Sequence, residues 1–356
     1  MTAFSDKLVE ILNHGSLNLA LGMGYALKIF DLMDGAQKAL TLDELAKISG
    51  LHSRYLKEWL SIMVCGEIVE LEKKQGEQLF SLPKAHGDLL CRRAGNNNLG
   101  VYTQEIPLLT AIAMDEVQQD FAVGKGVPFS KYPRFQSFMA ELSNAKHGQV
   151  LIKDFLPSVD QGRLVKNLES GIRACDIGCG QGVALNLMAQ AFPNSEFVGI
   201  DNHDRAIDQA KKSANALGIS NASFILQDAA TVHQNKSLEH YFDYICAFDA
   251  VHDQSHPLQV LAGIRYMLKP EGRFSMIDIK AQSEIQENKD HPMAPFLYTV
   301  SLMHCMPIGL NDKGQGLGMM WGRQKAMDLL TRAGFSRVTQ EEIPNDPFNL
   351  HFLCRV

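Results

Sequence analysis

The stretch RACDIGCGQGV, residues 173–183, decides the fold of this chain. The apolar residues up to Ile177 predict a buried strand, and glycines at positions 178, 180 and 182 predict a tight turn into a helix. Glycine has no Cβ, so the backbone of Gly178, Gly180 and Gly182 can come close to a bound molecule. In a parallel sheet, the crevice beyond the carboxyl end of such a strand is where nucleotide-like ligands bind.

The glycine loop differs from the dinucleotide-binding pattern GxGxxG, because Val183 stands where the third glycine would be. Asp176 lies two residues before Gly178, where a carboxylate would repel a pyrophosphate. The loop is therefore expected to face a cation or an ammonium. S-adenosylmethionine carries an ammonium and a sulfonium and no phosphate, so it is the expected cofactor.

Outward from this loop, strands and helices alternate from residue 162 onward, which predicts an α/β fold with a doubly wound parallel sheet. The expected strands are 172–177, 196–200, 222–226, 242–248, 273–279 and 349–356, and the expected helices are 182–192, 206–217, 256–268 and 321–333. Asp201 at the end of the second strand can accept both ribose hydroxyls, and Asp228 after the third strand can reach the adenine amino group. The candidate cofactor contacts are Asp176, Gly178, Gly180, Gly182, Asp201, Asn202, Asp228, Ala229 and Phe248.

Residues 1–95 are expected to form a mostly helical winged-helix domain, followed by a helical connector (96–160) and the cofactor-binding domain (161–356). A capping-box pattern at Thr41–Glu44 precedes a helix to Ser49, a second helix covers 54–65, and strands at 68–71 and 78–82 make the wing. Such a module either packs against the chain's other domain or a second subunit, or binds DNA through Arg54 and Lys57. The net charge of -6 counts against nucleic acid as a partner.

The composition is that of an ordinary globular protein, with 46% hydrophobic and 21% charged residues in 356. Neither a signal peptide nor a membrane span is expected from the sequence. The seven cysteines are odd in number and irregularly spaced, which indicates a reduced, cytoplasmic protein. Among them, Cys305 with His304 and His291 matches no zinc-binding spacing, so no metal is expected.

On the glycine loop, the acid that ends the second strand and the aspartate after the third, the chain resembles the class I S-adenosylmethionine-dependent methyltransferases, whose fold is Rossmann-like. The resemblance implies that Asp201 binds ribose, Asp228 binds adenine and the Gly178–Gly182 loop lies against the methionine part. The segments DHPMAPFLYTVSLMHCM (290–306) and GLGMMWG (316–322) are similar to a mycobacterial-type group of largely uncharacterised methyltransferases with an N-terminal winged helix.

The layout is also similar to plant-type small-molecule O-methyltransferases, which join a winged-helix dimerisation domain to a catalytic His-Asp pair. This implies a homodimer, with His252 as a general base and Asp253 orienting it. Those enzymes usually have a tryptophan after the pair, whereas this chain has Gln254. The alternative therefore stays open that His252 caps the following helix or orders the loop.

The apolar, methionine-rich insertion at 287–320 and the residue after it are expected to line the methyl-acceptor pocket or to pack a domain interface. Its candidate substrate contacts are Phe296, Tyr298, Met303, His304, Met320 and Trp321.

The leading hypothesis is in-line transfer of a methyl group to an oxygen or nitrogen of a small, partly apolar molecule. The alternative is a winged-helix DNA-binding regulator that senses S-adenosylmethionine. A protein or nucleic-acid methyltransferase is less favoured, because Phe248-Asp-Ala-Val stands where methylation of exocyclic amines requires Asn/Asp-Pro-Pro-aromatic.

Overall fold

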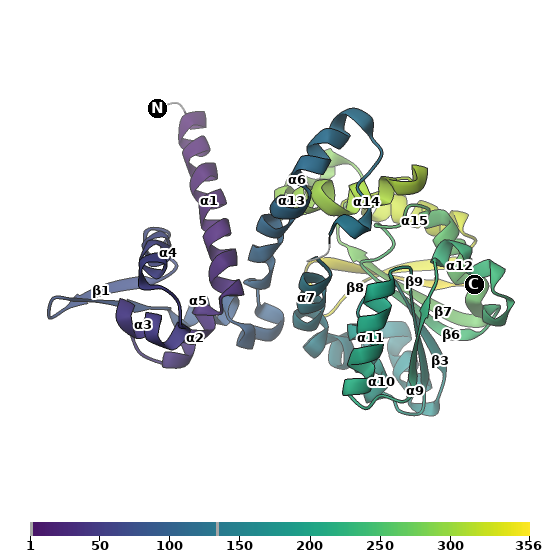
Figure 1. Ribbon diagram of the computed structural model, residues 1–356. Helices are drawn as coiled ribbons and strands as arrows, with labels where there is room; N and C mark the ends of the chain where they lie inside the picture. The colour runs from purple at the N-terminus through teal and green to yellow at the C-terminus, as the bar shows by residue number, and fades with distance from the viewer. Residues whose placement is uncertain (1–2, 133–134) are drawn as a thin grey trace. The chain divides into compact units, whose positions relative to one another are not determined.

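The computed structural model describes residues 3–132 and 135–356 and contains two compact units that divide the sequence between Ala111 and Ile112 (Figure 1). This division falls inside helix α6 (Glu105–Val123), within the segment expected to be a connector. The domain limits at residues 95 and 160 remain predictions.

The first unit is the winged helix that the sequence predicts, four helices followed by a hairpin. Its elements are α1 (Ala3–Ala26), α2 (Ile29–Ala36), α3 (Leu42–Ser49), α4 (Ser53–Cys65), β1 (Glu70–Lys74), β2 (Glu77–Ser81), α5 (Lys84–Leu90) and the short 3₁₀ helices η1 (Arg92–Asn97) and η2 (Val101–Gln104). The strands β1 and β2 pair antiparallel as the wing.

Local sequence signals set the ends of these helices. The capping box at the start of α3 is confirmed: the Glu44 amide donates to Thr41 Oγ1 at 3.2 Å, and the Thr41 amide donates to Glu44 Oε2 at 2.9 Å. Gly50 ends α3 in the left-handed conformation. Helix α4 begins one residue earlier than expected, because His52 Nδ1 accepts from the Arg54 amide and serves as the N-cap.

The second unit opens with helices and then builds the sheet. The helical segments before the sheet are η3 (Phe129–Lys131), α7 (Phe135–Val150), the π-helical η4 (Leu151–Phe155), α8 (Leu156–Ser158), η5 (Val159–Gly162) and α9 (Arg163–Ser170). The alternating part contains β3 (Arg173–Ile177), α10 (Val183–Ala191), β4 (Glu196–Asp201), α11 (Asp204–Ala216), β5 (Ala222–Leu226), η6 (Ala229–Gln234), η7 (Lys236–Leu238), β6 (Phe242–Phe248), α12 (Pro257–Met267) and β7 (Leu268–Ile279).

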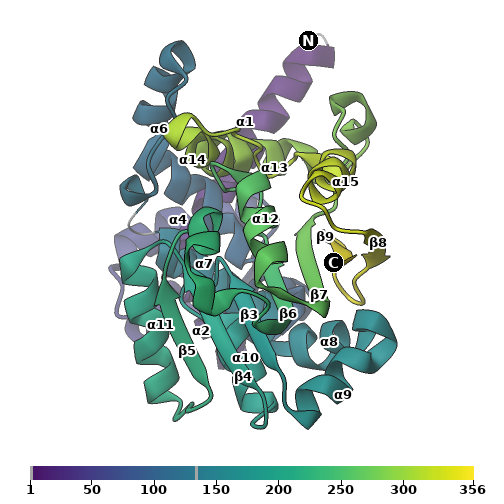
Figure 2. The same ribbon diagram turned by 90° about the vertical axis from the view of Figure 1, so that its right-hand side faces the viewer.

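The insertion follows β7, and two strands complete the sheet. The remaining elements are η8 (Ile285–Asn288), α13 (Ala294–Val300), the π-helical η9 (Ser301–Cys305), α14 (Met306–Leu310), η10 (Asn311–Lys313), α15 (Gly322–Arg332), β8 (Arg337–Glu342) and β9 (Asn349–Arg355). The seven strands lie in the order β5-β4-β3-β6-β7-β9-β8, which Figure 2 shows across the unit. The strands from β5 to β7 are parallel, and β9 runs antiparallel to both of its neighbours.

Alternate residues of the central strands enter two different cores, as the two-residue period of a strand requires. On one face, Ile177 and Ile245 pack in a cluster with side chains of α12 and α15. On the other face, Ala174 and Tyr244 pack with side chains of α9, α10 and α11. Both faces of the sheet are therefore covered, and the α/β fold class with a Rossmann-like sheet is confirmed.

Among the described residues, no helix has both the length and the apolar character needed to cross a bilayer.

Candidate active site

The glycine loop has the backbone conformation that its sequence predicts. Gly178, Gly180 and Gly182 have φ values of 69°, 53° and 74°, which side chains rarely tolerate. A Cβ on Gly178 would lie 2.6 Å from Ala250 Cβ, and one on Gly182 would lie 2.7 Å from the Phe224 ring. A Cβ on Gly180 would meet no atom of the described residues within 4 Å, so this glycine borders open space among them.

Asp201 holds this loop in place from the end of the neighbouring strand. Its Oδ2 accepts from the Gly180 amide at 2.9 Å, and its Oδ1 accepts from the His203 amide at 2.9 Å. Burial raises the pKa of the Asp201 carboxyl, although these amides lower it. Each oxygen keeps a second lone pair, so Asp201 can accept ribose hydroxyls while it fixes the loop.

Asp176 lies one residue before the end of β3 and is only 3% exposed. Burial, with a smaller contribution from Asp201, raises the pKa of Asp176 to about 8. A bound ammonium would restore the charge of this carboxylate at neutral pH. The buried acid, the open side of Gly180 and Asp201 together fit the ammonium, the methionine chain and the ribose of S-adenosylmethionine.

The other predicted cofactor contacts lie at the same edge of the sheet. Asp228 is exposed, and its Oδ1 accepts from the Ala230 amide at 2.8 Å as the N-cap of η6. Asn202 is exposed and Ala229 is buried. Phe248, at the end of β6, packs edge-on against His147 with ring centroids 4.8 Å apart. Their roles in cofactor binding stay predictions.

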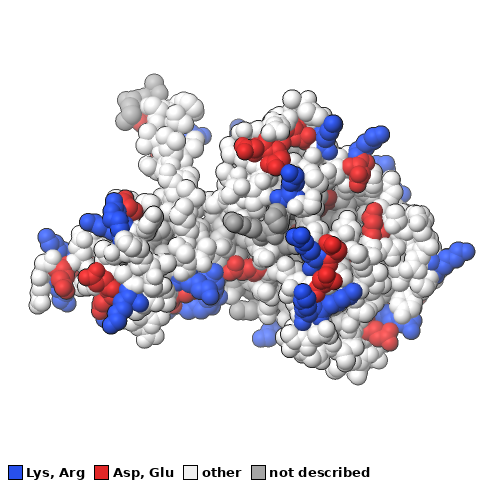
Figure 3. Space-filling view, viewed as in Figure 1, with Lys and Arg blue, Asp and Glu red and all other residues white. Residues whose placement is uncertain are grey.

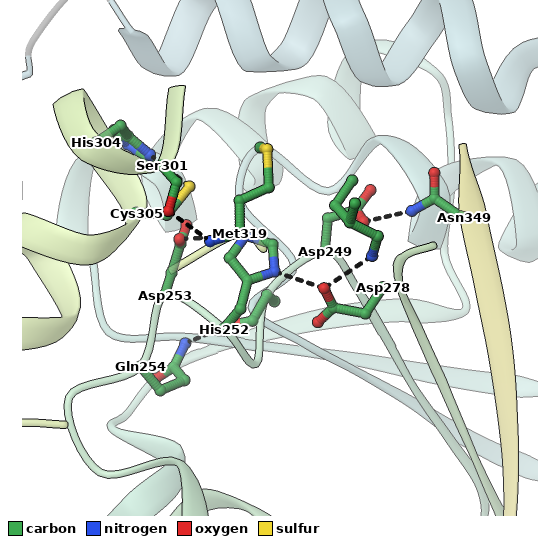
Figure 4. A network of polar contacts seen from close by, with 12 residues as sticks. Asp249, His252, Asp253, Gln254, Asp278, Ser301, His304, Cys305, Met319 and Asn349 are labelled. Carbon is green, nitrogen blue, oxygen red and sulfur yellow. Dashed lines mark hydrogen bonds and ion pairs between the residues drawn. The ribbon is translucent and has the colours of Figure 1, made fainter. Parts of the chain in front are cut away.

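His252 is buried beyond the end of β6 and lies between two carboxylates (Figure 4). Its Nδ1 lies 2.8 Å from Asp278 Oδ1, and its Nε2 lies 3.3 Å from Asp253 Oδ1. Asp278, not Asp253, therefore occupies the orienting position on Nδ1. The N-cap of α12 is His256, so the alternative that His252 caps this helix is not seen.

Burial by itself disfavours the charged imidazolium of His252. The nearby carboxylates of Asp278 and Asp253 outweigh burial and hold the pKa of His252 well above its ordinary value. The two carboxylates therefore favour the imidazolium form of His252, and the basic form increases as pH rises.

Sequence reasoning missed Asp278, although a signal for it exists. It is the acid in the otherwise apolar end of β7, SMIDI at 275–279, and is 1% exposed. A buried carboxylate needs a partner, so its presence in an apolar strand predicts a partner across the sheet edge. Sequence reasoning also missed the ion pair between Lys146 Nζ and Asp249 Oδ2, 2.7 Å apart, which lies next to His252.

The predicted acceptor contacts separate into three groups. His304 is 4% exposed and lies in an aromatic cluster, with its ring centroid 4.0 Å from that of Phe135 and 5.0 Å from that of Tyr132. Met303 contributes its carbonyl, which accepts from Tyr132 Oη at 2.8 Å. Phe296, Tyr298 and Met320 belong to a smaller apolar cluster under the insertion, and Trp321 belongs to the main core against the sheet.

Burial lowers the pKa of His304 to about 4, so this imidazole is neutral at pH 7. Its Nε2 is buried and has no hydrogen-bond partner among the described residues. His304 lies close enough to Asp253 and His252 for both to affect its pKa, which Asp253 raises and His252 lowers.

Two protein families match this chain in succession. Residues 15–92 match the family described as Rv2258c-like winged HTH domain, and residues 168–334 match the family described as Methyltransferase domain. A ribosomal RNA large subunit methyltransferase G from Pseudomonas aeruginosa is 29% identical over 168 residues, which cover 44% of this chain and 41% of that protein. The chain thus spans less than half the length of this relative.

Solved structures share the fold over the whole chain. The human N-acetylserotonin methyltransferase in complex with SAM superposes with a TM-score of 0.73 at 16% identity, over 100% of this chain and 98% of that one. Mitomycin 7-O-methyltransferase superposes with a TM-score of 0.67 at 16% identity, over 99% and 98%. The chain therefore carries a methyltransferase domain with the Rossmann-like fold, preceded by a winged helix-turn-helix domain of the Rv2258c-like family.

Proposed function

We propose that this chain transfers the methyl group of S-adenosylmethionine to an oxygen or nitrogen atom of a small, partly apolar molecule. The proposal rests chiefly on one observation: the loop held by Asp201 and the buried pair of His252 and Asp278 lie at the carboxyl ends of neighbouring strands. When bound, S-adenosylmethionine supplies a methyl group on a positively charged sulfur, ready for in-line attack.

The chain's own groups bind and orient the two reactants. Asp176 pairs with the ammonium, Asp201 accepts from the ribose hydroxyls, and the backbone at Gly180 leaves room for the methionine chain. In transfer to oxygen, the acceptor oxygen forms the new bond to the methyl carbon as the carbon–sulfur bond breaks. The acceptor proton moves to Nε2 of neutral His252, and Asp278 stabilises the imidazolium that forms.

The aromatic cluster supports a partly apolar acceptor. Tyr132, Phe135 and Phe129 surround the buried His304, with the Phe129 and His304 ring centroids 6.1 Å apart. Neutral His304 offers one unpartnered nitrogen within this apolar surrounding. This cluster places a neutral imidazole nitrogen among aromatic rings near His252, and an acceptor that joins an aromatic ring to one polar substituent would suit such surroundings.

The first test is calorimetric titration of the full chain with S-adenosylmethionine and with S-adenosylhomocysteine. Both are expected to bind, and Asp201→Ala should weaken binding at least about tenfold, because hydrogen bonds to a charged group contribute about 1.5–3 kcal/mol. The matched control is Asp204→Ala, whose side chain is 76% exposed on the next helix and should bind as the parent does.

Transfer is then measured with radiolabelled S-adenosylmethionine and a panel of phenols, amines and heterocycles. Absence of binding by the parent chain, or equal binding by Asp201→Ala, would contradict the proposal.

We infer that the partner of the first unit is a second copy of the chain. Helix α1 exposes large apolar side chains along its length, including Phe4, Leu8, Leu12 and Met23, which are 69%, 46%, 64% and 52% exposed. Several large apolar side chains exposed on one helix are typical of a protein–protein interaction site. Sedimentation should give a dimer for the parent chain and a monomer for Leu8→Glu/Leu12→Glu, and a monomeric parent chain would refute the inference.

The first unit offers little support for DNA binding. On the face drawn in Figure 3, its basic and acidic side chains are interspersed. On α4, Arg54 is paired with Glu58 in an ion pair four residues away. The charges of the first unit therefore count against a DNA-binding regulator.

A further inference from the structure

A histidine, a carboxylate and a thiol from two segments of the second unit converge at Nε2 of His252, the atom proposed above as the base (Figure 4). His252 and Asp253 follow β6, and Cys305 ends the π-helical turn η9 in the insertion. One ligand atom of each, Nε2, Oδ and Sγ, lies within 4.8 Å of the other two. Single π-helical turns are frequent at functional sites, because the extra residue redirects a side chain.

We propose that His252, Asp253 and Cys305 bind a divalent transition metal ion of the zinc type, through Nε2, a carboxylate oxygen and Sγ. Bonds of about 2.0–2.3 Å to a tetrahedral ion place the ligand atoms roughly 3.3–3.8 Å apart. The Nε2 to Oδ1 distance of 3.3 Å already meets this requirement. The remaining coordination position stays open, as in zinc sites with three protein ligands.

The partners of these atoms support a ligand between them. Asp253 Oδ1 is buried and has no hydrogen-bond partner of normal geometry among the described residues. This oxygen faces His252 Nε2 at 3.3 Å, and a bound cation would take the place of the imidazolium proton between the two atoms. On the far side of the ring, Nδ1 contacts Asp278, which is the arrangement that fixes a metal-bound histidine.

The chemistry of the ligand set selects the kind of ion. Thiolate and imidazole favour zinc-type ions over magnesium or calcium, which prefer all-oxygen sites. Burial and the Asp253 carboxylate raise the pKa of the Cys305 thiol, so metal binding must displace its proton.

A metal at Nε2 takes the place of the proton that His252 would accept. If the proposed methyl transfer is correct, the zinc-loaded chain should be slow with acceptors that need His252 as a base. This consequence rests on the proposed function, whereas metal binding does not.

The test uses the full-length chain after treatment with a chelator. Cobalt(II) should give intense visible bands typical of tetrahedral coordination, together with a thiolate-to-cobalt charge-transfer band, at one ion per chain. Zinc should displace it and compete with a chromophoric chelator. Cys305→Ser and Cys305→Ala should lose the charge-transfer band, and Asp278→Asn should weaken binding by about 10–100-fold.

Cys65→Ser is the matched control, because Cys65 is exposed and lies in the first unit. It should bind cobalt as the parent chain does. Binding of S-adenosylhomocysteine reports whether each variant is folded, and it also tests the proposed function separately. Weak octahedral bands only, or a charge-transfer band that survives in both Cys305 variants, would overturn the proposal.

Discussion

Replacing Asp278 by asparagine should lower the pKa of His252 by about one to two units. The contact between Nδ1 and Oδ1 is 2.8 Å long, and the two side chains are 2% and 1% exposed, so solvent screens it little. A hydrogen bond to a charged group contributes about 1.5–3 kcal/mol, and one pKa unit corresponds to about 1.36 kcal/mol. Asparagine keeps the shape and can still accept from the Ile279 amide, which the native carboxylate does at 2.8 Å.

The assay is an NMR titration of the full chain labelled on its histidine rings, with His252→Gln to assign the signal. It requires no knowledge of the acceptor. Once an acceptor is found, the rising limb of kcat/KM against pH should move to lower pH by the same interval. The plateau at high pH should fall, because an asparagine no longer stabilises the imidazolium that forms during transfer.

The pH dependence of the free energy of unfolding independently tests whether folding raises the pKa of His252. The folded pKa of His252 is raised, so its contribution to stability is complete below the ordinary histidine pKa and is lost as pH rises through the folded value. Asp278→Asn should reduce this loss of stability with rising pH. Asp243→Asn is the control. Its carboxylate lies at the start of β6 and forms an ion pair with Lys269 of β7. An unchanged His252 titration in Asp278→Asn would refute the electrostatic reasoning.

Two further predictions concern the cofactor loop. Because the pKa of Asp176 is raised to about 8, binding of S-adenosylhomocysteine near pH 6.5 should release close to one proton, and affinity should rise with pH toward about 8. Calorimetry in buffers of different ionisation heat counts this proton, and an equal count in Asp176→Asn would contradict the assignment. Gly182→Ala should lower the free energy of unfolding by about 1–3 kcal/mol, because its Cβ meets the Phe224 ring at a φ of 74°. Gly180→Ala, whose Cβ meets open space, should lose less stability in denaturant titrations but more cofactor affinity, and equal losses of stability in the two would contradict the packing argument.

Much of the fold could be predicted because its signals are local. The expected strands 222–226 and 242–248 have the observed bounds, since short apolar runs between turn residues mark buried strands. The strand β8 (Arg337–Glu342) was missed, because it lies at the sheet edge and reads RVTQEE. An edge strand with charged residues lacks the apolar pattern and protects the sheet from further pairing. The predicted wing strand 68–71 differs from the observed strand β1 (Glu70–Lys74), whose residues are all exposed.

The site was predictable only where one segment carries the signal. The glycine loop and Asp201 are each recognised from neighbouring residues, whereas the aromatic cluster joins Phe135 on α7 to His304 in the insertion. A cluster of this kind depends on which segments pack together, and sequence periodicity does not report that. Position in the sequence can also mislead. Trp321 is a predicted acceptor contact because it follows the insertion, but the structure buries its side chain in the main core.

The topology explains why Asp278 meets His252 although they lie 26 residues apart. Strand β3 pairs with β4 on one side and with β6 on the other, so the order of the strands reverses at β3. The connections that follow β3 and β6 therefore run to opposite sides, which leaves a crevice beside the glycine loop. Because β7 is the parallel neighbour of β6 and Phe248 aligns with Ile277, the residue after Ile277 lies at the same sheet edge as the segment that follows Phe248. An acid at position 278 therefore needs no shared local motif with His252. The sheet order brings the two together, and burial then makes the contact strong enough to set the protonation of the histidine.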